Sequence, residues 1–186
     1  NSSTQDITVT VTNVNDNSPA FTSDAAFSVV ENQTGIGTIT ATDDDGDTLS
    51  FSLSGTDASS MSINSSSGVL VFNSAPDYET KTSYSATVTA SDGTNSTTQD
   101  ITITITDIDD TAPVFTSSAS FSAAENQTSI GTVTATDVDT DNASITFSIS
   151  GSELSITSVG VLTFASTPDY ETKSSYSGTV TASDGT

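Results

Sequence analysis

Residues 101–106 read ITITIT and residues 7–12 read ITVTVT, and this alternation decides the fold class. Every second side chain of an extended strand points to the same face, so apolar side chains occupy one face and threonines the other. Leu49, Phe51 and Leu53 alternate with Thr and Ser in the same way. An apolar face opposite a hydroxyl face is typical of strands that cover a core on one side and meet water on the other. We therefore expect an all-β protein with almost no helix.

The alternating stretch belongs to a long internal repeat. Residues 7–21, ITVTVTNVNDNSPAF, return at 101–115 as ITITITDIDDTAPVF, at an offset of 94. Residues 76–94, PDYETKTSYSATVTASDGT, return at 168–186 as PDYETKSSYSGTVTASDGT, at an offset of 92. A unit of about 90 residues is too long for a solenoid repeat and suits a β-sandwich module.

Strand signals recur within one unit as short runs of Val, Ile, Phe, Thr and Tyr between clusters of Gly, Asn, Asp and Pro. Seven strands are predicted near residues 26–30, 36–42, 48–54, 60–63, 69–72, 83–90 and 99–106. The predicted fold is therefore a pair of tandem seven-stranded Greek-key β-sandwiches of the immunoglobulin-like kind.

The limits of the repeat do not coincide with the ends of the sequence. Residues 1–17 are predicted to be the last strand and linker of a preceding repeat, 18–111 a complete repeat, and 112–186 a second repeat lacking its final strand. An open sheet edge and a strand of matching sequence would then coexist in one molecule. Residues 1–12 are expected either to stay disordered or to complete the second repeat of another copy by strand exchange.

The charge of the chain limits its partners. It has 2 basic and 24 acidic residues, a formal net charge of −22, and no cysteine or histidine. Such a chain repels nucleic acid and anionic membranes, so cations are its natural partners. The missing residue types exclude disulfide bonds, a thiolate nucleophile, an imidazole base and the usual zinc ligands. No run of about 18 apolar residues occurs, so any export signal or membrane anchor is expected elsewhere in a longer chain.

The acidic residues cluster in motifs that return with the repeat. They are the Glu-Asn of ENQT, the Asp-x-Asp of ATDxD, the PDYE and ASDG segments, and the linkers NVNDNSPAF and DIDDTAPVF. Carboxylates and backbone carbonyls in such loops supply the six to eight oxygen ligands that Ca²⁺ prefers. The sequence therefore predicts calcium sites.

Together these motifs resemble the signature of cadherin-type repeats, and the likeness covers the whole chain. In that family, Ca²⁺ ions lie between successive repeats and take ligands from the first repeat, the linker and the next repeat. For the one complete junction, the resemblance implies the ligands Glu31, Asp77, Glu79, Ile108, Asp109, Asp110, Thr111, Asp137, Asp139, Asn142 and Asp184. Ile108 and Thr111 are expected to donate backbone carbonyls, and so is Asn142. The leading linker position, occupied by Asn13 in the first copy, is not counted as a ligand.

The resemblance also implies two half-sites, one at each end of the chain. The amino-terminal half-site comprises Asn15, Asp16, Asn17, Asp43, Asp45 and Asp92. The carboxy-terminal half-site comprises Glu125, Asp169 and Glu171. Head-to-tail packing of two copies would bring such halves together.

The family resemblance implies Ca²⁺-binding repeats that rigidify an extracellular adhesin, secreted or anchored elsewhere in the full chain. Its expected partners are calcium ions, neighbouring repeats, and the same protein on another cell or a glycan; homophilic binding follows from the family alone. The scarcity of Lys and Arg also resembles the repeat arrays of large bacterial surface adhesins. The alternative is a carbohydrate-binding module, although the chain has no Trp to form a sugar platform. An enzyme is not expected, because no insertion forms a cleft around paired carboxylates.

Overall fold

The computed structural model describes residues 1–139 and 144–185. The chain divides into two compact units, Asn1–Asp107 (unit 1) and Ile108–Thr186 (unit 2). The division places linker residues 108–111 with unit 2. The repeat limits inferred from the sequence, 18–111 and 112–186, are not tested by this division and stay predictions.

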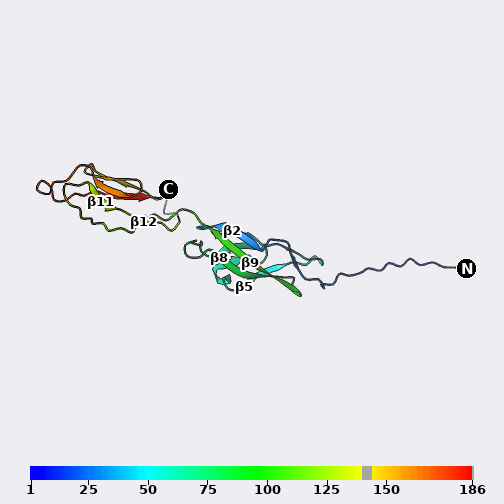
Figure 1. Cartoon of the computed structure of the whole chain (residues 1–186). Coiled ribbons are helices and arrows are strands. Elements are labelled where there is room, and N and C mark those ends of the chain that lie inside the picture. Colours follow the sequence, from blue (N-terminus) through cyan, green and yellow to red (C-terminus); the bar gives the residue numbers. More distant parts are fainter. Residues whose placement is uncertain (140–143, 186) are drawn as a thin grey trace. The chain divides into compact units, whose positions relative to one another are not determined.

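Unit 1 contains two main sheets and a short strand pair. Its strands are β1 (Ala20–Phe21), β2 (Ala26–Val30), β3 (Gly35–Thr38), β4 (Ala41–Thr42), β5 (Ser50–Ser54), β6 (Met61–Ile63), β7 (Val69–Phe72), β8 (Ser83–Ser91) and β9 (Ser96–Thr106). One sheet has the order β2-β9-β8-β5, the other has the order β3-β7-β6, and β1 pairs with β4. Strand β2 runs parallel to β9, and the other pairs are antiparallel. Figure 1 shows β2, β9, β8 and β5 side by side.

The core of unit 1 lies between the two sheets and has the predicted alternation. Ile101, Ile103 and Ile105 of β9 are 1%, 0% and 2% exposed, while the threonines between them face solvent. Leu70 and Val88, from β7 and β8, are fully buried in the same cluster. The period-two pattern therefore identified the strands and also their inner faces.

The predicted strand 36–42 is divided between two pairings. Strand β3 pairs with β7, whereas β4 pairs with β1, a two-residue strand that the sequence did not predict. Between them, the buried Ile39 donates its N–H to the carbonyl of Gly68 at 2.9 Å. The helical content of the described residues is one 3₁₀ turn, Ala58–Ser60. None of these residues forms a helix long and apolar enough to cross a membrane.

Unit 2 repeats this plan with shorter strands. They are β10 (Val114–Phe115), β11 (Ser129–Thr132), β12 (Ala135–Thr136), β13 (Thr146–Ile149), β14 (Leu154–Ile156), β15 (Val161–Phe164) and β16 (Val180–Ser183). The sheets are β11-β15-β14, β13-β16 and the pair β10-β12. Figure 1 places β11 and β12 within this unit.

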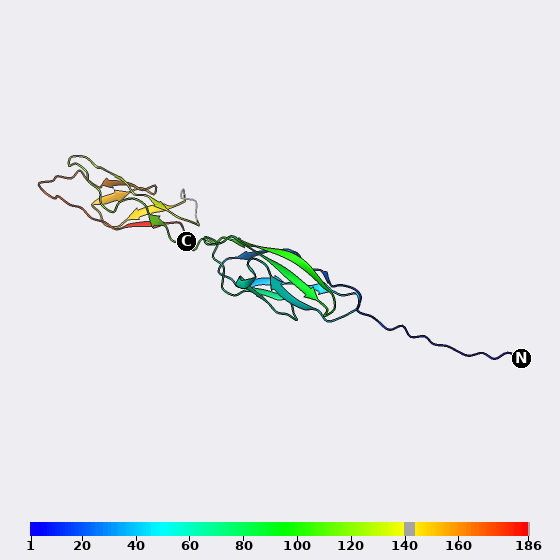
Figure 2. The ribbon, with the colours of Figure 1, turned by 90° about the horizontal axis from the view of Figure 1, so that it is seen from below.

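Residues 1–16 form no strand in the structure. Figure 2 shows the amino-terminal segment as an extended trace that leaves the sheets of unit 1. Ile7, Val9 and Val11 are 80%, 81% and 90% exposed. The segment has the composition of a core strand, but its apolar side chains are not buried here.

Candidate metal centres

Carboxylates gather in groups of three within each unit, with ligand atoms less than 4.8 Å from one another. Among the described residues, unit 1 has the Asp43 cluster (Asp43, Asp45, Asp47) and the Glu31 cluster (Glu31, Glu79, Asp107). Unit 2 has the Asp137 cluster (Asp109, Asp137, Asp139) and the Glu125 cluster (Glu125, Asp169, Glu171). Like charges at this spacing repel each other, and a bound cation removes that repulsion.

The Asp43 cluster lies in the loop that follows β4. The N–H of Asp45 donates to Oδ1 of Asp43 at 3.0 Å, and Gly46 has a φ of 79°, which lets the loop turn back on itself. Oδ2 of Asp43 is buried and accepts no hydrogen bond within the described part of the chain. A buried carboxylate oxygen of this kind fits a cation ligand. Asp47 joins this cluster although the sequence analysis did not select it.

Asp45 accepts hydrogen bonds from two residues of the first linker, Asp16 and Asn17. Its Oδ2 accepts the N–H groups of Asp16 and Asn17 at 2.9 and 2.8 Å, and its Oδ1 accepts the side-chain amide of Asn17 at 2.8 Å. These bonds, above all that of the Asn17 backbone, hold the pKa of Asp45 below its usual value. The predicted residues of the amino-terminal half-site are thus connected by hydrogen bonds.

The side chain of Asn95 connects Asn15 and Asn17 of the amino-terminal half-site. Asn95 was not predicted from the sequence. Its side-chain amide donates to Oδ1 of Asn15 at 2.9 Å and to the carbonyl of Asn17 at 2.9 Å. Burial raises the pKa of Asp92, but hydrogen bonds from the backbone N–H groups of Asn95 and Thr94 outweigh this effect and leave the pKa lowered. The only signal in the sequence was an Asn placed two residues after the glycine of ASDG.

The Glu31 cluster forms where two parallel strands end together. Val30 of β2 lies opposite Thr106 of β9, so Glu31 and Asp107 leave the sheet at the same edge. The N–H of Glu31 donates to the carbonyl of Thr106 at 3.1 Å, and Oε2 of Glu31 accepts the N–H of Tyr78 at 2.9 Å. Glu31 is only 2% exposed. Asp107 was not predicted as a ligand, because the equivalent residue in the first linker is Asn13.

Asp77 shapes the turn that presents Glu79. Its carboxylate accepts the N–H of Thr80 at 3.1 Å and the Thr80 hydroxyl at 2.9 Å, and its carbonyl accepts the N–H of Lys81 at 2.9 Å. The carboxylate of Asp77 is not among the three that converge at Glu31. Its predicted role as a metal ligand therefore stays a prediction.

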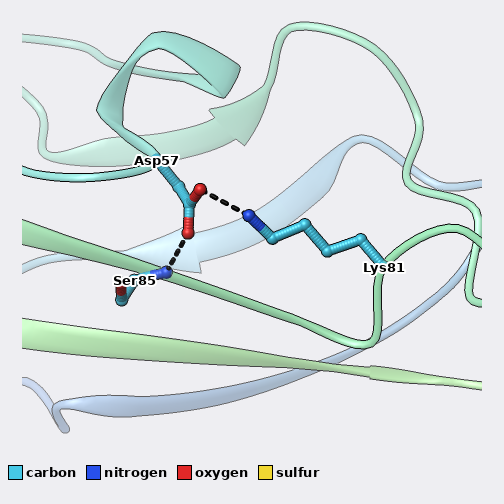
Figure 3. Close-up of polar contacts among 3 residues, drawn as sticks. All are labelled: Asp57, Lys81 and Ser85. Carbon is cyan, nitrogen blue, oxygen red and sulfur yellow. Dashed lines mark hydrogen bonds and ion pairs between the residues drawn. The ribbon is translucent and has the colours of Figure 1, made fainter.

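Lys81 is the last residue of the same turn, and its side chain forms an ion pair. Its Nζ binds Oδ1 of Asp57, whose Oδ2 accepts the N–H of Ser85 at 2.9 Å (Figure 3). The bond from Lys81, followed by that from Ser85, lowers the pKa of Asp57. The ammonium also lies 4.6 Å from the centre of the Tyr84 ring. The lysine is thus bound to an acid outside the Glu31 cluster.

Unit 2 repeats this lysine arrangement. Lys173 binds Glu153 and lies 4.9 Å from the centre of the Tyr176 ring. The chain has only two basic residues, so both of its permanent side-chain cations bind acids outside the clusters.

The Asp137 cluster of unit 2 repeats the hydrogen bonds that Asp43 and Asp45 form in unit 1. Oδ2 of Asp139 accepts the N–H groups of Asp110 and Thr111 at 3.0 and 2.5 Å, and the N–H of Asp139 donates to Oδ1 of Asp137 at 2.9 Å. Asp109 completes the group.

Three residues predicted for the same junction are not part of this cluster. Asn142 lies outside the described residues. Asp184 is half-buried, and the side chain of Ile108 is 39% exposed. Their ligand roles, and the carbonyl role of Thr111, stay predictions.

The Glu125 cluster of unit 2 repeats a hydrogen bond of the Glu31 cluster, but its carboxylates are more exposed to solvent. Oε2 of Glu125 accepts the N–H of Tyr170 at 3.0 Å. The Thr172 hydroxyl donates to Oδ2 of Asp169 at 2.8 Å and is the main cause of the lowered pKa of Asp169. All three carboxylates are exposed, whereas Glu31 is buried. No counterpart of β9 covers this cluster among the described residues.

Comparison with known proteins identifies the repeated unit. The model of the Cadherin domain family matches residues 25–106 and 118–186. Protocadherin Fat 4 of Mus musculus is 36% identical over 203 residues, which cover 99% of this chain and 4% of that protein. Cadherin EGF LAG seven-pass G-type receptor 1 of Mus musculus is 32% identical over 199 residues, covering 98% of this chain and 7% of that protein. The chain therefore spans only a small part of these relatives.

Solved structures share the fold. Human protocadherin-24 EC1-2 superposes with a TM-score of 0.73 at 21% identity, covering 91% of this chain and 94% of that chain. Mouse cadherin-23 EC22-24 superposes with a TM-score of 0.72 at 26% identity, covering 91% of this chain and 60% of that chain. The predicted fold class, tandem immunoglobulin-like sandwiches of the cadherin type, is confirmed.

Proposed function

The chain belongs to the cadherin domain family, and we propose that it binds Ca²⁺ at its clustered carboxylates and that the bound ions stiffen the chain. Proteins of this family are extracellular, calcium-dependent adhesion proteins, and the family is not one of enzymes. The family match favours this class over the alternative of a carbohydrate-binding module.

The observation that carries the proposal is the Glu31 cluster. Glu31 is almost completely buried, yet two further carboxylates approach it within 4.8 Å. Burying the charge of Glu31 and placing two exposed carboxylates beside it is costly unless a cation compensates the negative charge. Lys81 and Lys173 do not serve here, because they bind Asp57 and Glu153. A cation from solution is therefore the natural partner of the cluster.

Ca²⁺ fits the clusters better than other common ions. The side-chain donors are carboxylates, with amide and backbone oxygens nearby, and Cys and His are absent from the sequence. Oxygen-rich loops of variable geometry suit Ca²⁺, whereas Mg²⁺ requires near-ideal octahedral geometry and usually keeps several waters.

The linker supports a mechanical role for the ions. Asp107, Asp109 and Asp110 follow β9 directly in the sequence. From the family resemblance, we infer that one set of ions draws ligands from unit 1, from the linker and from unit 2. Ions with ligands on both sides of a linker remove the freedom of the units to move independently and stabilise both folds by mass action.

Adhesion is proposed as the role of the longer protein to which such repeats belong. Neighbouring repeats of the same chain and copies on another cell are the partners that the family implies.

Calorimetric titration of Ca²⁺ into chelator-stripped chain tests the proposal, combined with thermal unfolding and small-angle scattering in Ca²⁺ and in chelator. We expect several bound ions, a higher melting temperature and a narrower distribution of particle lengths in Ca²⁺. Titration with Mg²⁺ is the control for non-specific screening of the charge. Absence of binding at millimolar Ca²⁺ would refute the proposal and would leave the carbohydrate-binding alternative to be tested by glycan screening.

A further inference from the structure

Two loops of unit 1 bind the first linker, residues 13–17. In the loop after β4, the carboxylate of Asp45 accepts the N–H groups of Asp16 and Asn17 at 2.9 and 2.8 Å, and the Asn17 side-chain amide at 2.8 Å. The side-chain amide of Asn13 donates to the carbonyl of Asp45 at 2.9 Å. Every linker group in these bonds is a donor, so this loop supplies the acceptors.

The second loop, the turn between β8 and β9, supplies a donor through Asn95. Its Nδ2 donates to Oδ1 of Asn15 and to the carbonyl of Asn17, both at 2.9 Å, and lies 3.3 Å from Oδ2 of Asp92. A backbone carbonyl and a carboxylate only accept hydrogen bonds, so the nitrogen of the Asn95 amide must face them. Asn17 is therefore bonded to unit 1 through its N–H, its side chain and its carbonyl.

The turn between β8 and β9 fixes the backbone of Asn95. Oδ1 of Asp92 accepts the N–H groups of Thr94 and Asn95 at 2.7 and 2.6 Å. The Ser91 hydroxyl donates to the carbonyl of Asn95 at 3.1 Å, and Gly93 has a φ of 95°, which permits the tight turn. The backbone of Asn95 serves the turn, whereas its side chain serves the linker.

The two linkers of the chain differ in charge at the position that Asn95 binds. Residues 13–17, NVNDN, contain one acid, whereas residues 107–111, DIDDT, contain three. Asn15 corresponds to Asp109, whose carboxylate belongs to the Asp137 cluster of unit 2. Repulsion within such a cluster is relieved by a bound cation, whereas the amide of Asn15 is neutral and is already bonded to Asn95. The contacts of Asn15 with unit 1 therefore require no ion.

We propose that Asn95 is a positioning residue, whose amide keeps residues 15–17 docked on unit 1 when no ion is bound. The docked linker then presents its oxygen atoms to Ca²⁺ already in place, so less conformational freedom is lost when the ion binds. Docking itself does not depend on Ca²⁺. Its effect on Ca²⁺ affinity rests on the proposed function.

Hydrogen exchange of the Asp16 and Asn17 amides in chelator measures the docking, because both N–H groups donate to Asp45. We expect slow exchange of both amides in the wild-type chain of 186 residues. Asn95→Ala loses the bonds to the linker but keeps the backbone bonds of the turn, so both amides should exchange about tenfold faster. The amides of β9 should keep their protection. Wild-type Asp16 and Asn17 amides that exchange in chelator as in an unfolded chain would overturn the proposal.

Two further variants separate the donor group of Asn95 from its size and from the turn. Asn95→Asp keeps the shape of the side chain but replaces the donor by a carboxylate, so exchange in chelator should be at least as fast as in Asn95→Ala. Thr94→Ala is the matched control, because this exposed side chain forms no hydrogen bond within the described part of the chain. Retained protection in Asn95→Asp, or equally fast exchange in Thr94→Ala, would contradict the role of the Asn95 amide.

Asn15→Ala tests the same contact from the linker. The variant removes the Oδ1 acceptor, so the Asp16 and Asn17 amides should again exchange faster in chelator. Combined with Asn95→Ala, the acceleration should be smaller than the product of the two single effects, because the shared bond is lost only once. Effects that multiply in full would show that the two side chains act independently, against the proposal.

Ca²⁺ affinity supplies a readout that a purely structural role of the turn would not change. Titration followed by the amide resonance of Gly46, in the loop of the Asp43 cluster, should give a several-fold weaker affinity in Asn95→Ala than in the wild type. Thr94→Ala should bind Ca²⁺ like the wild type. A higher affinity in Asn95→Ala would show that the amide competes with the ion, which would overturn the positioning role.

The failure of docking and the failure of calcium binding are distinguishable. Faster exchange of the linker amides in the Asn95→Ala chain in chelator would support docking even if calorimetry detected no Ca²⁺. Bound ions together with unprotected Asp16 and Asn17 amides in wild-type chelator samples would refute docking alone and leave the proposed function intact.

Discussion

The backbone N–H of Tyr78 donates a hydrogen bond of 2.9 Å to Oε2 of Glu31, which lies 47 residues earlier in the chain. This bond fixes a buried carboxylate beside Glu79 and Asp107. The same bond recurs between Tyr170 and Glu125 in unit 2. The carboxylate is thus oriented by a backbone N–H group from a distant part of the chain.

Glu31→Gln should separate the charge of this side chain from its structural role. The Gln side-chain oxygen can still accept the Tyr78 N–H, so the unit should fold, and the melting temperature in chelator should stay the same or rise because one repelling charge is gone. Ca²⁺ affinity should fall by about tenfold or more, which corresponds to about 1.4 kcal/mol. Calorimetric titration and thermal unfolding in both buffers measure the two effects.

The matched control is Glu125→Gln, at the equivalent but exposed position of unit 2. It should have a smaller effect on Ca²⁺ affinity, because its cluster is open to water and screened. An equal loss of affinity in the two variants would contradict the importance of burial at Glu31.

Acid should weaken unit 1 through Asp57. Its pKa lies below the ordinary 3.8 in the folded chain, mainly because Lys81 binds it, so its contribution to stability is complete above pH 3.8 and is lost as pH falls through the lower folded value. Asp45 and Asp92 of the same unit also have lowered pKa values, so their protonation weakens unit 1 in the same direction. The informative quantity is therefore the difference between wild type and Asp57→Asn in chelator.

That difference in unfolding free energy should be largest at neutral pH and should shrink as the pH is lowered to about 3. Urea unfolding at several pH values measures it. Asp24→Asn is the control, because Asp24 is exposed and the two lysines of the chain bind other acids. A difference that stays constant across this pH range would show that protonation of Asp57 does not change the unfolding free energy of unit 1.

The sequence predicted the fold because its strands alternate so regularly. The inner faces of β5 and β9 follow directly from TLSFSLS and ITITIT. The division of residues 36–42 into β3 and β4 was missed, because Ile39 is apolar and extended like its neighbours. The bond from the N–H of Ile39 to the carbonyl of the distant Gly68 lies where the chain passes from one pairing to the other.

The candidate site was predicted as a set of motifs rather than as a geometry. The short-range pattern identified Asp43 and Asp45, and the structure then added Asp47 from the same loop. Asp107 was missed because Asn13 stands at the equivalent position of the first linker, and Asn95 was missed because its contacts depend on where the hairpin of β8 and β9 turns. The place of Asn95 two residues after the glycine of ASDG does not by itself indicate its bonds to the distant Asn15 and Asn17.

Lys81→Met should weaken unit 1 modestly. Met keeps much of the apolar stem but loses the ion pair with Asp57 and the contact with the Tyr84 ring. Because the Lys81 side chain is 40% exposed, solvent screening limits the expected loss of unfolding free energy to about 0.5–1 kcal/mol. Hydrogen exchange of the β9 amides reports the stability of unit 1.

Lys173→Met provides the comparison in unit 2. There the partners are 44% and 47% exposed, whereas Asp57 is only 13% exposed. The loss should therefore be smaller than for Lys81→Met. A larger loss in unit 2 would contradict the dependence on burial.

Gly68→Ala should destabilise unit 1 more than any surface change considered above. Gly68 has a φ of 70°, and a Cβ at this position would lie 2.1 Å from the carbonyl oxygen of Ile39. The left-handed conformation alone costs a non-glycine residue about 1–2 kcal/mol. The clash adds to this cost, since relieving it would move the backbone that bonds Ile39 to Gly68. Urea unfolding in chelator, with hydrogen exchange of the β9 amides, measures the loss.

Gly46→Ala separates the two causes, because Gly46 has a φ of 79° but no heavy atom lies within 4 Å of the position that its Cβ would take. It should therefore show the conformational cost alone, and equal losses at the two positions would show that the close approach to Ile39 does not matter.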